Sequence, residues 1–194
     1  MLGAVVSVRR LRDKGRIRPE DLEQRLGAAA QELLDQKINI AGWYPIQVFS
    51  ELMNLHWEVA GRRDPQFMRD EGARSSDRLF DSGIYQQLQF AEKAERVQSR
   101  EALVRQSRLI TSITGSLYNF LEISVKVDDD RPDELQIRYG NAALFDEALR
   151  FSTEGFMNRI NHRQGSSRRW TSERPAPDRV VFRMALPTRL AGGA

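Results

Sequence analysis

Residues 43–57 have the sequence WYPIQVFSELMNLHW, and the fold depends on this stretch. Pro45 suits the first turn of a helix, where a missing N–H breaks no hydrogen bond. Apolar side chains then recur on two stripes: Ile46, Phe49, Met53, Trp57 and Ala60 on one, and Val48, Leu52, Leu55 and Val59 on the other. A helix that is apolar around most of its circumference is buried on several sides. We therefore expect a central helix that ends at Gly61 and is covered by the rest of the chain.

Further helices are expected on both sides of this stretch. A proline followed by two acidic residues begins an amphipathic helix over residues 19–37. Before it, residues 4–8 are β-prone and predict a short strand. After the central helix, residues 66–90 form a more polar helical region, and a serine N-cap begins another helix over residues 99–115.

Past these helices the hydrophobic period changes from about 3.6 residues to about 2. Residues 117–127 and 135–139 alternate apolar and polar side chains, which predicts a hairpin around an acidic turn. A helix is expected over residues 141–160, and strands over 168–173 and 180–186. The fold class is therefore α+β, with an N-terminal helical layer packed on a C-terminal antiparallel sheet in strand–strand–helix–strand–strand order.

Composition excludes several classes of function. The chain has 194 residues and no cysteine, so disulfides, thiolate metal sites and cysteine nucleophiles are excluded, as suits a cytoplasmic protein. The net charge is only +3 and arginines are interspersed with acids, so nucleic-acid binding is not expected. No apolar run is long enough to span a membrane. We expect one domain over residues 1–187 and a flexible tail over 188–194.

Residues that could carry catalysis or bind metal are few. His56 lies on the central helix, where it could be a ligand or a buried histidine with a structural role, and His162 is expected at the surface. The acidic residues 128–130 lack the glycine and distal glutamate of a calcium loop. Residues 112–116 match neither a nucleophile elbow nor a phosphate loop. We expect no enzyme activity, no metal and no cofactor.

Three pieces of sequence suggest a family: IAGWYPI at residues 40–46, Gly72-Ala73-Arg74, and Gly155-Phe156 inside the last predicted helix. With the C-terminal strand pattern they resemble the bacterial heme-NO-binding-like superfamily, particularly its uncharacterised myxobacterial paralogues and the 4-vinyl-reductase-type sensor domains. The resemblance implies a domain that often dimerises and holds an apolar molecule between helices and sheet. The chain lacks the cysteines of the 4-vinyl-reductase type and the Tyr-x-Ser-x-Arg cradle of heme-binding members.

The aromatic residues carry the functional hypothesis. They can fill an ordinary core, or some of them can line an apolar pocket with a few polar groups. The expected ligand-binding residues are Trp43, Tyr44, Phe49, Met53, His56, Trp57, Tyr85, Phe120 and Phe156. We expect a non-catalytic sensory or signalling module that binds a small hydrophobic ligand and forms a homodimer. The alternative is a dimeric structural or protein-interaction subunit with a filled core and no ligand.

Overall fold

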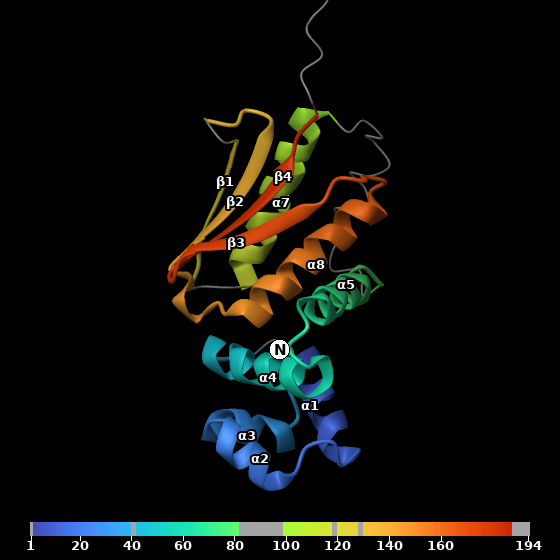
Figure 1. Ribbon diagram of the computed structural model, residues 1–194, viewed down its shortest axis with the longest axis vertical. Helices are drawn as coiled ribbons and strands as arrows, with labels where there is room; N and C mark the ends of the chain where they lie inside the picture. The colour runs from blue at the N-terminus through green and yellow to red at the C-terminus, as the bar shows by residue number, and fades with distance from the viewer. Residues whose placement is uncertain (1, 40–41, 82–98, 118–119, 128–129, 188–194) are drawn as a thin grey trace, which may run out of the picture.

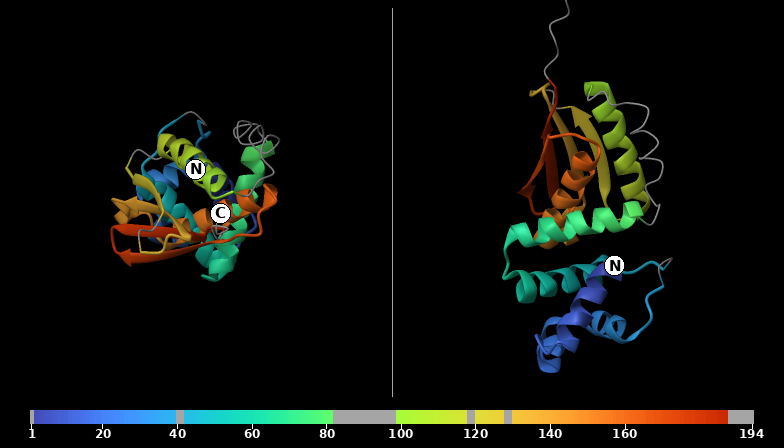
Figure 2. Two further views of the ribbon diagram at one scale, coloured as in Figure 1. Left: turned by 90° about the horizontal axis from the view of Figure 1, so that it is seen from above. Right: turned by 90° about the vertical axis from the view of Figure 1, so that its right-hand side faces the viewer.

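The computed structural model describes residues 2–39, 42–81, 99–117, 120–127 and 130–187. Helices α1 to α4 form an N-terminal layer, and a four-stranded sheet with its own helices stacks on that layer through α5 and α8 (Figures 1 and 2). This arrangement confirms the α+β class and the order of its elements. No described helix combines the length and the apolar character that crossing a membrane requires.

The first two N-terminal predictions were wrong in detail. Residues 4–8 lie in α1 (Leu2–Asp13), not in a strand, because the apolar residues from Ala4 to Leu11 are spaced to bury one face of a helix. The helix predicted over residues 19–37 is divided into α2 (Pro19–Arg25) and α3 (Ala28–Asp35). Gly27 between them has an extended backbone, and its N–H donates to Glu51 Oε2 at 2.7 Å.

The central helix is confirmed as α4 (Ile46–Gly61). It contacts α1, α3, α5 and α8, so it is covered on several sides as its two apolar stripes predict. Its buried residues are Ile46, Val48, Leu52, Met53, Leu55, His56, Trp57 and Gly61. Arg62 ends the helix in a left-handed conformation with φ of 50°.

Helices α5 (Pro65–Asp81) and α8 (Glu147–Arg163) cross at very close range. A Cβ built on Gly72 would lie 1.8 Å from the Ser152 carbonyl oxygen, and one on Gly155 would lie 1.9 Å from the Arg69 carbonyl oxygen. The two glycines of the family resemblance therefore let the helix backbones touch. The part of the predicted helical region beyond Asp81 lies outside the described residues.

Within the described residues, four strands form one antiparallel sheet in the order β1-β2-β4-β3. Their bounds are β1 (Glu122–Val127), β2 (Glu134–Gly140), β3 (Trp170–Ala176) and β4 (Arg179–Ala185). Helix α7 (Arg100–Leu117) lies against β1 and β2, while α8 lies against β3. The short helix η1 (Ala142–Leu144) joins β2 to α8. Strand β1 begins later than predicted because Leu117 still belongs to α7.

The inner face of the sheet carries the alternating apolar residues of β1, β2 and β4. Buried cross-strand pairs such as Ile137 with Phe182 join β2 to β4. The opposite face is polar, and Arg183 there bridges Glu134 at 2.7 Å and Glu173 at 2.6 Å. The helices α7 and α8 pack against this sheet.

Candidate functional site

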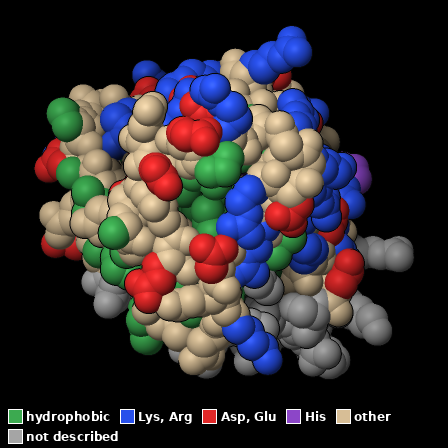
Figure 3. Space-filling view, turned by 90° about the horizontal axis from the view of Figure 1, so that it is seen from below, with side chains coloured by type: hydrophobic (Ala, Val, Ile, Leu, Met, Phe, Trp, Pro, Cys, Tyr) green, Lys and Arg blue, Asp and Glu red, His purple; other side chains and the backbone are tan. Residues whose placement is uncertain are grey.

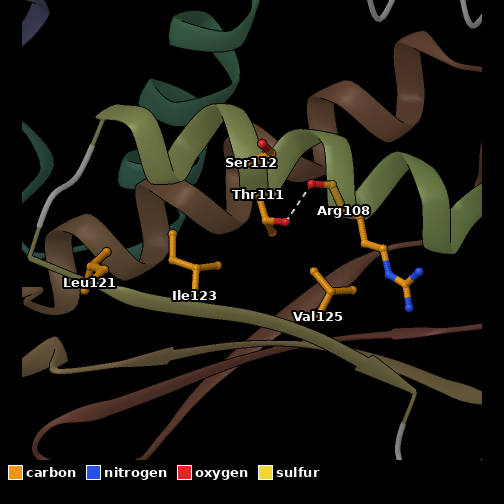
Figure 4. A pocket seen from close by; sticks show the side chains of 6 residues that line it. All are labelled: Arg108, Thr111, Ser112, Leu121, Ile123 and Val125. Atoms are coloured by element: carbon orange, nitrogen blue, oxygen red, sulfur yellow. Dashed lines mark hydrogen bonds between the residues drawn. The ribbon is translucent and has the colours of Figure 1, made fainter.

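An open groove of about 480 Å³ lies between α7 and β1 (Figure 4). Its lining residues are Arg108, Thr111, Ser112, Leu121, Ile123 and Val125. The groove is thus located between a helix and the edge strand of the sheet. None of its lining residues belongs to the set expected from the sequence, although Phe120 directly precedes Leu121.

The floor of the groove is apolar because strand β1 alternates. Ile123 and Val125 point toward α7, and in the sheet they stand opposite Tyr139 and Ile137 of β2. Both remain only half-buried, whereas the equivalent side chains of β2 are buried. The apolar surface of β1 is therefore left partly uncovered by α7.

The helical wall is polar and carries a positive charge. Arg108, Thr111 and Ser112 are spaced to share one face of α7, and the Thr111 hydroxyl donates to the Arg108 carbonyl oxygen at 2.9 Å. The Arg108 guanidinium is exposed, and no described carboxylate forms an ion pair with it. An apolar floor beside a cation that no described acid neutralises suits an amphipathic anion.

The predicted residues on α4 pack into the core. Met53, His56 and Trp57 are buried, and Phe49 is half-buried. The Trp57 ring N–H donates to the Asp64 carbonyl oxygen at 2.7 Å, which satisfies its polar atom. These four residues are therefore part of the helical layer.

The other predicted residues are dispersed. Trp43 is 67% exposed, which differs from the expectation that it belongs to the aromatic core. The Tyr44 hydroxyl instead holds the loop before α4, because it accepts from the Asn39 N–H at 2.9 Å. Phe156 is half-buried on α8, and Tyr85 lies outside the described residues.

His56 is 7% exposed, and its ring meets Phe67 edge-on at 5.1 Å between centroids. Burial lowers the pKa of His56 below its ordinary value, the nearby Glu71 opposes that shift, and Arg74 adds to it. The neutral imidazole is therefore the form that the fold favours. As expected, His162 is exposed, although it lies in the last turn of α8 and not in a loop.

A second hollow of about 340 Å³ lies along the outer side of α4, beside α2. Its charged side chains are already engaged: Glu51 accepts from the Gly27 N–H, and Glu58 pairs with Arg25 at 2.6 Å and with Arg63 at 2.7 Å. Acidic and basic side chains are interspersed over the underside of the molecule (Figure 3). We assign this hollow a structural role.

Comparisons with known proteins identify the fold. No protein-family model matches the sequence, and no curated protein matches it either. Two solved structures are similar: the Fe(II) unliganded H-NOX protein from K. algicida (14% identity, 98% of each chain, TM-score 0.52) and a point mutant of that protein (15%, 97% of each chain, 0.53). The S. oneidensis H-NOX protein in its Fe(II)NO state aligns more loosely, with a TM-score of 0.49. The chain therefore has an H-NOX-like fold.

The residues of this chain do not fit a heme. The sequence has two histidines, and neither His56 nor His162 lies on α7 or on a strand beside the groove. The His56 ring is buried in the core and packed edge-on against Phe67, away from the groove. None of the four tyrosines begins a Tyr-x-Ser-x-Arg sequence. Among the described residues no histidine or acid cluster could hold a metal ion.

Proposed function

We propose that this protein is a non-catalytic sensory module that binds a small amphipathic anion in the groove between α7 and β1. The observation that carries the proposal is the groove itself, with its apolar floor and the Arg108 guanidinium beside it. The H-NOX-like fold supports a ligand-binding role by analogy, because the similar K. algicida protein is described by its Fe(II) unliganded state.

The size of the groove favours a ligand of modest length. Small-molecule sites usually measure about 300–1,000 Å³ and are lined mainly by apolar atoms with a few polar groups. The floor from Leu121 to Val125 offers a strip for a short acyl chain, and Arg108 supplies a charged partner for a carboxylate. A medium-chain carboxylate such as decanoate fits both features.

The test is calorimetric titration of the purified protein with decanoate and with decanol. We expect decanoate to bind more tightly, and Arg108→Gln to weaken its binding by about threefold to tenfold, because a partly exposed ion pair contributes modestly. The matched control is Lys14→Gln, which removes the same charge at an exposed position beside the end of α1, away from β1 and the groove, and should leave binding unchanged.

Equal affinity for decanoate and decanol, or equal loss from both variants, would contradict the assignment to this groove. The sequence-based prediction that Met53, His56 and Trp57 contact a ligand is tested in the same titration through Met53→Ala. If that variant alone abolishes binding, the ligand occupies the helical layer and the groove proposal fails. A cytoplasmic location stays a prediction.

A further inference from the structure

The two edges of the sheet are protected to different degrees. Among the described residues, β1 is bonded to β2 on one side and has no strand neighbour on the other, and β3 forms the opposite edge (Figure 1). β3 contains Pro175, and its register with β4 shifts between Glu173 and Ala176. Proline and irregular register both discourage an edge strand from pairing with another chain.

Strand β1 has neither protective feature. Its sequence, EISVKV, contains no proline, and it pairs with β2 in unbroken register over six residues. β-branched side chains occupy half of its positions, which favours extended backbone. An edge strand of this kind can accept a further strand through the backbone groups of its outer side.

The charges of β1 are complementary to a reversed copy of themselves. When a second β1 runs antiparallel with Ser124 opposite Ser124, Glu122 stands opposite Lys126 of the second copy, and Lys126 opposite its Glu122. On the inner face the same register places Ile123 opposite Val125. Glu122 and Lys126 are both exposed, so both can reach across a strand pair.

We propose that two copies of this chain associate through β1, antiparallel about a two-fold axis at Ser124, which joins the two four-stranded sheets into one. Two ion pairs flank the axis on the outer face, and the half-buried Ile123 and Val125 of both copies meet on the inner face. This interface is isologous, so it closes after two copies. It does not depend on whether the groove binds a ligand.

Sedimentation equilibrium of the full chain tests the proposal. We expect a reversible dimer, and we expect both Lys126→Glu and Glu122→Lys to weaken it about tenfold or more, because each places like charges opposite each other in two cross-strand pairs. An equimolar mixture of the two variants should regain the wild-type affinity, because both charge pairs are attractive in the mixed dimer.

Two choices of variant distinguish a loss of this interface from other causes of a weaker dimer. Lys14→Glu makes the same charge change at an exposed position at the end of α1, and it should leave the dimer unchanged. Glu122 also accepts a hydrogen bond from Asn141 at 2.8 Å, so Lys126→Glu is the variant that leaves this bond intact. A wild-type monomer at every concentration, a dimer insensitive to Lys126→Glu, or a mixture that stays weak would each overturn the proposal.

Discussion

The close crossing of α5 and α8 predicts that replacing Gly72 with alanine destabilises the fold. Replacing Gly72 with alanine places a methyl group 1.8 Å from the Ser152 carbonyl oxygen and 2.9 Å from the Phe156 nitrogen. Both atoms belong to the backbone of α8, so no side-chain rotation can relieve the overlap. The two helices must separate by about 1.7 Å to restore a normal contact distance near 3.5 Å.

The magnitude follows from two opposing effects. Overpacking a well-packed interior costs about 1–3 kcal/mol and sometimes more, and rigid backbone on the far side puts Gly72→Ala at the upper end. Alanine in place of glycine stabilises a helix by about 1 kcal/mol. The expected loss is therefore about 2 kcal/mol or more, or roughly 4–8 °C in Tm for a chain of this size.

Urea unfolding followed by circular dichroism measures this loss, and Gly3→Ala is the matched control. Gly3 lies in α1, and a Cβ there would meet only the end of the Arg78 side chain at 3.4 Å. The same substitution should therefore be neutral or stabilise by up to about 1 kcal/mol. The double variant Gly72→Ala/Gly155→Ala should cost less than the sum of the single changes, because one separation of the helices relieves both overlaps. A wild-type denaturation midpoint for Gly72→Ala would refute the close crossing.

Three further outcomes are expected. Asp146→Ala should lower the free energy of unfolding by about 2 kcal/mol, because this side chain caps α8 and accepts from Ser50 and Asn54 of α4; chemical denaturation measures the loss. His56→Phe should reduce the fall in Tm as pH drops below about 6.5, since a depressed pKa in the fold means that the unfolded chain binds the proton first; thermal unfolding over a series of pH values measures this. Decanoate binding and dimerisation should be linked. The factor by which decanoate changes the dimer dissociation constant should equal the factor by which dimerisation changes decanoate affinity, and sedimentation with and without ligand measures the first of these.

The sequence predicted the sheet well because its signals are local. Strict alternation identified β2 and β4, and their inner-face residues are buried as the alternation requires, while Gln136 and Val181 on the other face are buried as well. The first helix was missed because residues 4–8 contain three valines, and a short β-branched run resembles a strand. Tertiary packing makes this segment helical, since α1 buries Val5 and Val8 against the helical layer.

The candidate site could not be predicted in the same way. The groove exists because α7 leaves Ile123 and Val125 half-covered, and the distance between a helix and an edge strand is not encoded in any single motif. The aromatic residues attracted attention by their type, yet Trp43 is exposed and Trp57 is in the core. Arg108 could have been noticed as a cation on a polar helix face, but the sequence does not reveal which arginines pair with an acid in the fold.

The H-NOX-like fold is held together here by the chain's own side chains. Tyr139 at the end of β2 is 3% exposed and meets Phe145 and Phe182 edge-on at 5.2 and 5.1 Å between centroids. Asp146 then ties the start of α8 to α4, so the sheet and the helical layer are joined through protein contacts. Aromatic packing and a hydrogen-bonded carboxylate therefore stabilise this junction. The edge of the sheet, with β1 and its groove, lies away from this junction, and it is where we propose that a ligand and a second copy of the chain bind.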